Sequence, residues 1–437
     1  MSLLPETTRR LDEIVADAQA RGRVPSLITG VVRDGELRHV SGAGDLPAPD
    51  PDTQYRIGSI SKIMTAVLVM RLRDEGRLAL DDPLRRHLPD APIGDVTIRH
   101  LLGHVSGLQR EPDGEWWERA AGGDLTALLR GVGPDKRAYP PHRGYHYSNL
   151  AYGLLGGVLA GITGEDWATL VARHLLEPLG MRRTTYSPVE PYARGYVVHP
   201  WLGTLREEPR EDAGAMAPAG QLWSTVTDLA TWAAFLADPR PDVLAPATLA
   251  EMCAPVVIGD PDSWTWGHGL GLQLWRRGER VFVGHTGSMP GYLAFLVVHR
   301  PSATGVVAFA NAYTLHGGSI AALGLDLLTT VLDREPARPP RPWRPCAAPP
   351  PEIGEVCGRW WWMGREYEAA WDDAEKELVV TPLVMPGAVP WRFAAEGPDR
   401  WRCRSGMNDG EVLRVLRGQS GAVEALDIAT GVFTRDP

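Results

Sequence analysis

The chain has 437 residues, a formal net charge of −9, 44% hydrophobic residues and 23% charged residues. This hydrophobic fraction excludes a mostly disordered chain, and the negative charge argues against nucleic acid as a partner. No apolar run reaches the roughly 18–20 residues that cross a bilayer. The N-terminal segment lacks the basic start, apolar middle and small-residue site of a secretory signal. We therefore expect a cytoplasmic protein with no membrane partner.

The cysteines and lysines narrow the possible chemistry. The four cysteines form no CxxC pair and no metal-ligand spacing, so we expect free thiols and predict no metal and no other cofactor. Only three lysines are present, whereas the other 42 basic residues are arginine. A lysine such as Lys62 is therefore less expected to be an ordinary exposed surface residue without a specific role.

The first two thirds of the chain combine one early hairpin with several helices. Apolar spacing predicts an amphipathic helix over 6–21, and then a hairpin whose strands, 27–32 and 37–40, flank Asp34–Gly35. Residues 59–75 are apolar almost all round, which predicts a helix buried inside a domain. Shorter helices are predicted over 97–102, with Thr97 as N-cap, over 149–163 and 166–175, and over 227–236, with Thr227 as N-cap.

Strands return towards the C-terminus of this region. They are predicted over 271–275, 280–284, 292–299 and 305–311, and a last helix is predicted over 318–332. Strands at both ends with helices between them indicate one sheet built from the N- and C-terminal parts, interrupted by a helical insertion. The first domain is expected to span residues 1–335.

A change of composition marks a second domain. Residues 336–351 hold eight prolines in sixteen positions, which indicates an extended linker. Seven of the sixteen tryptophans follow between positions 343 and 401, among short alternating segments separated by Gly, Pro, Asp and Asn. We predict a small all-β domain over 352–437, either a sandwich or a barrel.

The first candidate for chemistry is the segment Ser59-Ile60-Ser61-Lys62 at the start of the buried helix. Residues three apart share a helix face, so the Ser59 hydroxyl and the Lys62 amine are expected to meet. An apolar environment lowers the pKa of a lysine towards that of a usable base, which a serine nucleophile needs. The plainer interpretation is a serine cap beside a lysine that extends to solvent.

The second candidate is Tyr147-Ser148-Asn149, just before a predicted helix. A tyrosine hydroxyl can pass a proton to or from a nucleophile and a leaving group, and an asparagine amide offers both a donor and an acceptor to a substrate. Taken alone, a tyrosine and an asparagine in this position more often serve packing and capping.

The third candidate is His285-Thr286-Gly287, which follows an apolar strand and precedes Ser288. Glycine at a turn or strand edge lets the backbone approach a ligand closely. A lone histidine at such a place is more often structural. The evidence for a functional role is that this motif follows the other two in the sequence.

Together, SISK, YSN and HTG resemble the motif set of the serine β-lactamase and penicillin-binding protein superfamily. The chain looks closest to the class C-like branch, which includes esterases, D-stereospecific peptidases and penicillin-binding-protein-type thioesterases. The segments LLGHVSGL (101–108) and PAGQLWSTVTDLA (218–230) also resemble segments of this superfamily. The resemblance covers about residues 5–335 and implies an α+β fold, with an antiparallel sheet flanked by helices and a helical subdomain. The last segment resembles the lipocalin-like barrel appended to this branch.

The resemblance implies a role for each motif residue. Ser59 is expected to be the nucleophile and Lys62 its base or proton relay. Tyr147 is expected to activate the acceptor or to protonate the leaving group, and Asn149 to orient the substrate. In the third motif, His285 stands where other members have lysine, and histidine lacks a permanent positive charge. The carboxylate of a β-lactam or of a peptide is therefore expected to bind less well here. The backbone N–H groups of Ser59 and Ser288 are expected to form the oxyanion hole, and Thr286 and Gly287 to contact substrate.

The expected activity is that of a serine hydrolase or acyltransferase. Ser59 attacks a peptide, ester or thioester carbonyl next to a D-residue, and the acyl group then passes to water or an amine. One alternative is a thioesterase that releases and cyclises nonribosomal peptides from a carrier-protein-bound thioester, with Arg435 binding a peptide carboxylate. Another is a scaffold or binding protein without catalysis.

Overall fold

The computed structural model describes residues 2–315, 320–336, 345–346, 350–384 and 387–437. The chain forms two compact units, Met1–Arg338 and Pro339–Pro437. Residues 337–344 and 347–349 of the predicted linker lie outside the described residues, as do residues 318–319 of the predicted last helix.

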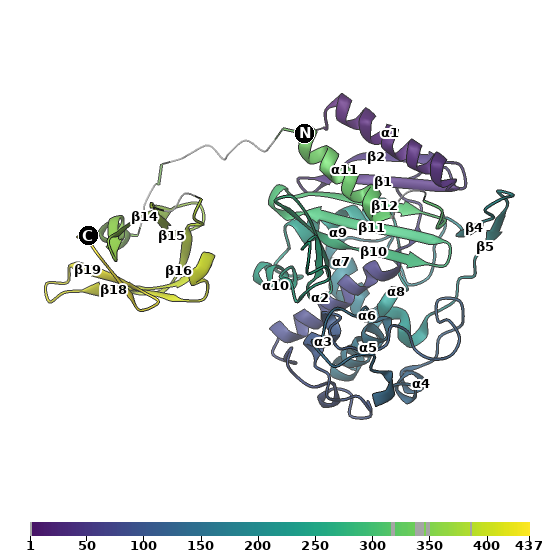
Figure 1. Ribbon diagram of the computed structural model, residues 1–437, viewed down its shortest axis with the longest axis horizontal. Helices are drawn as coiled ribbons and strands as arrows, with labels where there is room; N and C mark the ends of the chain where they lie inside the picture. The colour runs from purple at the N-terminus through teal and green to yellow at the C-terminus, as the bar shows by residue number, and fades with distance from the viewer. Residues whose placement is uncertain (1, 316–319, 337–344, 347–349, 385–386) are drawn as a thin grey trace. The chain divides into compact units, whose positions relative to one another are not determined.

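The first unit is built on one antiparallel sheet of eight strands (Figure 1). In spatial order the strands are β2 (Glu36–Gly44), β1 (Ser26–Arg33), β12 (Thr304–Ala310), β11 (Tyr292–His299), β10 (Arg280–Met289), β9 (Gln273–Arg277), β8 (Trp266–His268) and β7 (Val257–Ile258). The N-terminal hairpin therefore pairs with the last strand of the unit, as the sequence predicts. Asp34 and Gly35 both have positive φ, which is the backbone that a tight hairpin turn requires.

Helices cover both faces of this sheet because neighbouring strand residues point to opposite sides. Val306 and Val297 face a cluster that includes Leu11 of α1 (Pro5–Gly22) and Leu328 of α11 (Ile320–Arg334). Val307 belongs instead to the larger cluster on the other face, which includes α9 (Val226–Ala237). Figure 1 shows α1 and α11 along one face and the helical region beyond the other.

The helical region lies between β2 and β7 in the sequence. Besides α9, its helices are α2 (Ser61–Asp74), α3 (Ile98–Leu102), α4 (Leu125–Arg130), α5 (Asn149–Thr163), α6 (Trp167–Val171), α7 (Glu177–Leu179), α8 (Ala217–Gly220) and α10 (Pro246–Met252). Two small sheets pair β3 (Tyr55–Arg56) with β6 (Trp223–Ser224) and β4 (Tyr196–Val198) with β5 (Leu205–Glu207). The predicted α+β fold, with an antiparallel sheet and a helical subdomain, is confirmed.

Side-chain caps begin several of the helices, and one of them differs from the prediction. Thr97 accepts from the His100 N–H and begins α3 as expected. The cap of α9 is Thr225, which accepts from the Asp228 N–H, and not Thr227, whose hydroxyl donates to the Pro51 carbonyl. The prediction of Thr227 is wrong, because Thr225 stands three residues before Asp228, which is the spacing of a capping box, and the helix begins directly after Thr225.

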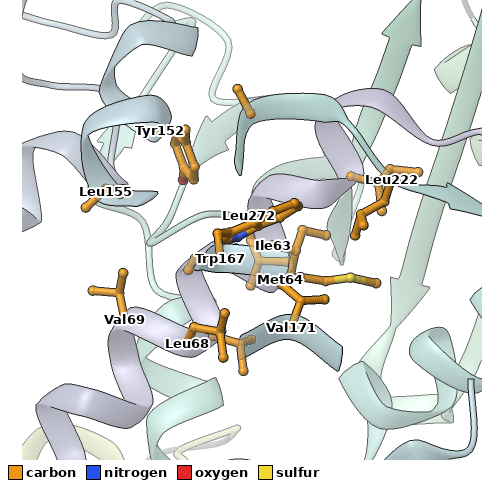
Figure 2. Packing of buried hydrophobic residues seen from close by; sticks show 14 of the residues in the cluster. Ile63, Met64, Leu68, Val69, Tyr152, Leu155, Trp167, Val171, Leu222 and Leu272 are labelled. Carbon is orange, nitrogen blue, oxygen red and sulfur yellow. The ribbon is translucent and has the colours of Figure 1, made fainter. Parts of the chain in front are cut away.

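Helix α2 is buried on all sides, which explains its apolar sequence. Figure 2 shows Ile63, Met64, Leu68 and Val69 among side chains contributed by other segments, and these four residues are at most 3% exposed. Such a helix is held rigidly by packing, so the residues at its N-terminus have a fixed position.

The second unit is a closed antiparallel barrel preceded by α12 (Ile353–Val356). Its strands are β13 (Gly358–Trp362), β14 (Arg365–Asp372), β15 (Glu377–Pro382), β16 (Trp391–Gly397), β17 (Arg400–Cys403), β18 (Val412–Arg417), β19 (Val423–Ile428) and β20 (Gly431–Thr434). Alternate residues such as Trp360, Tyr367, Phe393 and Phe433 are buried in its core. The predicted C-terminal β-barrel is confirmed. Among the described residues, no helix has the length and apolarity needed to cross a membrane.

Candidate active site

Ser59 lies in a short 3-10 turn, η1 (Gly58–Ile60), which leads directly into α2. Lys62 stands on the first turn of α2, and its side chain is fully buried. The Lys62 Nζ lies 2.9 Å from Ser59 Oγ and 2.6 Å from the Ala219 carbonyl oxygen, to which it donates. The expected pairing of Ser59 with Lys62 is therefore present in the structure.

The environment of Lys62 makes its amine suitable as a base. Burial lowers the pKa of Lys62 from 10.5 to about 7, although the negative charges of Glu111 and Glu118 oppose this shift. A neutral amine has a lone pair that can accept the Ser59 proton, so a large fraction of the protein is ready for that transfer near neutral pH.

The pH dependence of acylation should report this group. We expect the rate of Ser59 acylation by an uncharged activated ester to rise about tenfold per pH unit below pH 7 and to level off above it, because only the neutral amine accepts the proton. Release of p-nitrophenol, corrected for spontaneous hydrolysis, measures this rate. Burial also raises the pKa of Glu118 to about 7, so Glu118→Gln is the control. Its profile should keep the same rise and plateau but move to lower pH, because the charge of Glu118 no longer raises the pKa of Lys62. A flat profile in the wild-type protein would contradict the role of Lys62.

Tyr147 completes the hydrogen bonding of the Ser59 hydroxyl. Its O–H donates to Ser59 Oγ over 2.7 Å, and its ring centroid lies 5.0 Å from Lys62 Nζ. Burial raises the pKa of the Tyr147 hydroxyl well above its usual range, which keeps this group protonated. With Tyr147 as donor to Oγ, the Ser59 proton is free to pass to a neutral Lys62.

Asn149 begins α5 and is buried next to a carboxylate that the sequence did not indicate. Its Nδ2 donates to both carboxylate oxygens of Glu111, at 2.8 and 3.0 Å, and Trp117 Nε1 donates to Glu111 over 2.7 Å. The Asn149 Oδ1 is buried without a hydrogen-bond partner among the described residues. This differs from the expectation that both ends of the amide serve the substrate, because Glu111 takes the donor end.

The third motif lies inside β10, which continues past the predicted end at residue 284. β9 pairs with β10 only as far as Gly284, so the following residues, including His285, lie on an edge that β9 leaves open. The His285 ring centroid is 6.2 Å from that of Tyr147. Burial lowers the pKa of His285 well below its usual value, so this position carries a neutral side chain.

The residues after His285 approach the Ser59 turn. Gly58 has a φ of +51°, and a Cβ there would lie 2.5 Å from the Ser288 nitrogen. Only glycine allows this contact, which places the backbones of the two expected oxyanion donors next to each other. Gly287 packs still more closely on Ile57, since a Cβ there would lie 1.9 Å from the Ile57 carbonyl oxygen. The Thr286 hydroxyl donates to Gln273 Oε1 over 3.1 Å, so it is already bonded within the protein.

Arg435 belongs to the second unit and is bonded within it. Its guanidinium donates to the carbonyl oxygens of Glu355, Cys357 and Arg359 and lies 3.7 Å from the Trp360 ring centroid. These contacts give Arg435 a part in holding the barrel. Its binding of a peptide carboxylate stays a prediction.

The sequence did not predict several of the residues that lie near Ser59. Glu111 and Glu118 occur in an irregular loop that carries no motif, so no sequence signal marks them. His104 lies in LLGHVSGL, a segment to which the sequence assigns no role, and His268 ends β8. The rings of His104 and His268 are buried and 4.7 Å apart.

The antiparallel sheet, the helical region and a serine–lysine pair at the start of a buried helix are the features of β-lactamase/transpeptidase-like proteins. The family described as Beta-lactamase matches residues 11–329, and the chain belongs to this family. Residues 349–435 match a family described as a domain of unknown function, DUF7586.

Individual relatives agree with this assignment. The human protein named putative beta-lactamase-like 1 is 29% identical over 382 residues, which cover 82% of this chain and 74% of that protein. The crystal structure of a D-stereospecific amidohydrolase from Streptomyces sp. has 26% identity and a TM-score of 0.64, and covers 74% of this chain and 98% of its own. The crystal structure of SurE, with 25% identity and a TM-score of 0.61, covers 98% of this chain and 99% of its own.

Proposed function

We propose that the protein is a serine hydrolase or acyltransferase that forms an acyl-enzyme on Ser59. The observation that carries this proposal is the position of Ser59 Oγ, 2.9 Å from Lys62 Nζ and 2.7 Å from the Tyr147 hydroxyl. Lys62 takes the Ser59 proton as the oxygen attacks a carbonyl, and the backbone N–H groups of Ser59 and Ser288 receive the developing oxyanion. Tyr147 then passes its proton to the leaving group and regains one from the Lys62 ammonium, so that the net transfer is of the Ser59 proton to the leaving group.

The proposed substrates are amides, esters or thioesters whose acyl part ends in a D-residue. A Streptomyces structure described as a D-stereospecific amidohydrolase supports this choice, since it matches nearly three quarters of the chain. The neutral His285 also supports it, because no permanent cation stands in the third motif to bind a β-lactam carboxylate.

Trapping the acyl-enzyme tests the proposal directly. The protein is mixed with an activated ester of a D-amino acid or of its L-enantiomer, and intact mass and peptide mapping follow. An adduct on Ser59 and faster turnover of the D-ester are expected. No adduct and no turnover would favour a scaffold protein instead, and an adduct on Ser61 or Ser106 would overturn the assignment of the nucleophile.

Hydrolysis and cyclisation share the acyl-enzyme and differ only in what removes the acyl group. A peptidyl thioester with a D-residue at its C-terminal end therefore gives a linear acid if water attacks and a cyclic peptide if the substrate's own amine attacks. A mainly cyclic product would favour a peptide-releasing thioesterase with a carrier-bound natural substrate. In that case, removal of residues 346–437 should reduce cyclisation more than the cleavage of a simple ester.

The third motif should affect substrate choice more than the reactivity of Ser59. We expect His285→Ala to reduce turnover of a D-peptide amide at least about tenfold more than turnover of a small activated ester, because His285 lies beside Tyr147 on the open edge of β10. The ratio of kcat/KM values for the two substrates measures this. An equal loss for both substrates would instead assign His285 to the chemical step.

A further inference from the structure

The His104 side chain belongs to the LLGHVSGL segment. Among the described residues of this segment, His104 is the one whose ring contacts the ring of Tyr147. It lies just after α3 with a positive φ of 55°, and no part of it is exposed. A bulky residue in this backbone conformation is uncommon and is kept only where the surroundings hold it. The contacts of His104 therefore show what holds it in this conformation.

Two hydrogen bonds join His104 to the residues on either side of Tyr147. The His146 N–H donates to the His104 carbonyl oxygen over 2.8 Å. The Ser148 N–H donates to His104 Nδ1 over 3.1 Å. One residue thus accepts from the backbone N–H groups of both neighbours of Tyr147.

The His104 ring also backs the Tyr147 ring. Their centroids are 4.4 Å apart with an angle of 33° between the planes, and His268 lies edge-on behind His104 at 4.7 Å. Burial lowers the pKa of His104 well below its usual value. The ring is therefore neutral, and because Nδ1 accepts from Ser148, its proton is on Nε2.

We propose that His104 is the positioning residue for Tyr147: it holds the backbone on both sides of Tyr147 and supports its ring, which keeps the hydroxyl at Ser59 Oγ. This inference rests on the proposed acyl-enzyme function. The segment before α5 is irregular, so without this support Tyr147 would have more conformations available. Displacement of a catalytic group by about 1 Å can cost about a hundredfold in rate.

Three substitutions separate the parts of this role. His104→Asn keeps an acceptor at the δ position and tolerates positive φ, whereas His104→Phe keeps a ring and loses the acceptor. His104→Gln moves the acceptor one bond further out and is the replacement if the phenylalanine variant does not fold. With an activated D-amino acid ester, we expect His104→Phe or His104→Gln to lower kcat at least about tenfold with little change in KM, and His104→Asn to retain more of the activity.

A double-mutant cycle with Tyr147→Phe distinguishes positioning from a general structural effect. If His104 acts through the Tyr147 hydroxyl, His104→Phe should cause little further loss once that hydroxyl is absent. Equal losses in both backgrounds, or an asparagine variant as impaired as the other two, would overturn the inference. Wild-type activity in Tyr147→Phe alone would overturn it together with the proposed role of Tyr147, while an adduct still formed on Ser59 would leave the acyl-enzyme proposal standing.

Discussion

Ser59→Ala should abolish both the covalent adduct and turnover, with a fall in kcat of at least about 10⁵-fold for any substrate that the wild-type protein cleaves. Removal of a nucleophile that acts as a unit with its base leaves only binding and oxyanion stabilisation, and losses of this size are typical. Intact mass after incubation with an activated ester, together with kcat, measures the effect. The fold should remain, since Ser59 lies in a turn at the edge of the core and loses only its hydroxyl.

Ser61→Ala is the matched control for this experiment. Ser61 is two residues away and fully buried, and its hydroxyl oxygen accepts a long 3.4 Å hydrogen bond from the Leu222 N–H. This variant should still form the adduct. An adduct that persists in Ser59→Ala but disappears in Ser61→Ala would show that the wrong serine was assigned.

Lys62→Met should reduce acylation about 10⁴-fold or more. Methionine keeps an unbranched chain of similar length inside the apolar helix and removes only the amine that accepts the Ser59 proton. Single-turnover adduct formation measures the rate. Lys376→Met, at a lysine that is 66% exposed in the second unit, is the control and should acylate at the wild-type rate. Acylation of Lys62→Met within about tenfold of wild type would assign the base to another group.

The same variant tests the pKa of Lys62 without any substrate. The folded protein releases the Lys62 proton near pH 7, whereas the unfolded chain keeps it until about 10.5. Between these values the unfolded state binds more protons, so the free energy of unfolding of the wild-type protein should rise with pH relative to that of Lys62→Met. Denaturant unfolding of both proteins across this range measures the difference. A constant difference would show that burial does not shift this amine.

The fold and the central serine could be predicted because their signals are local. The buried helix appears as an uninterrupted apolar segment, the Asp34–Gly35 turn as a hairpin, and the barrel as alternating short strands after a proline-rich segment. The spacing of three residues between Ser59 and Lys62 brings both to one side of the helical turn that leads into α2, whatever surrounds them. Sequence spacing alone therefore led to a hydrogen-bonded pair that the structure contains.

Other parts depend on contacts between distant residues. Asn149 was expected to present its whole amide to substrate, but Glu111, 38 residues earlier in the chain, takes its Nδ2. Nothing in the local sequence marks Glu111, because its loop has neither periodicity nor a motif.

The sequence by itself determined the order of the elements, the two-part organisation and the choice of Ser59 and Lys62 as the candidate pair. These features depend on helix periodicity and residue spacing, which act within a few positions of the chain. Only the tertiary structure brought Tyr147 to Ser59, 88 residues away, and placed His104 behind it. It also decided the charge states: burial inside the folded unit keeps His285 neutral and brings the pKa of Lys62 to about 7. The cost of removing water from a charged group depends on everything packed around that group, and this packing exists only in the folded chain.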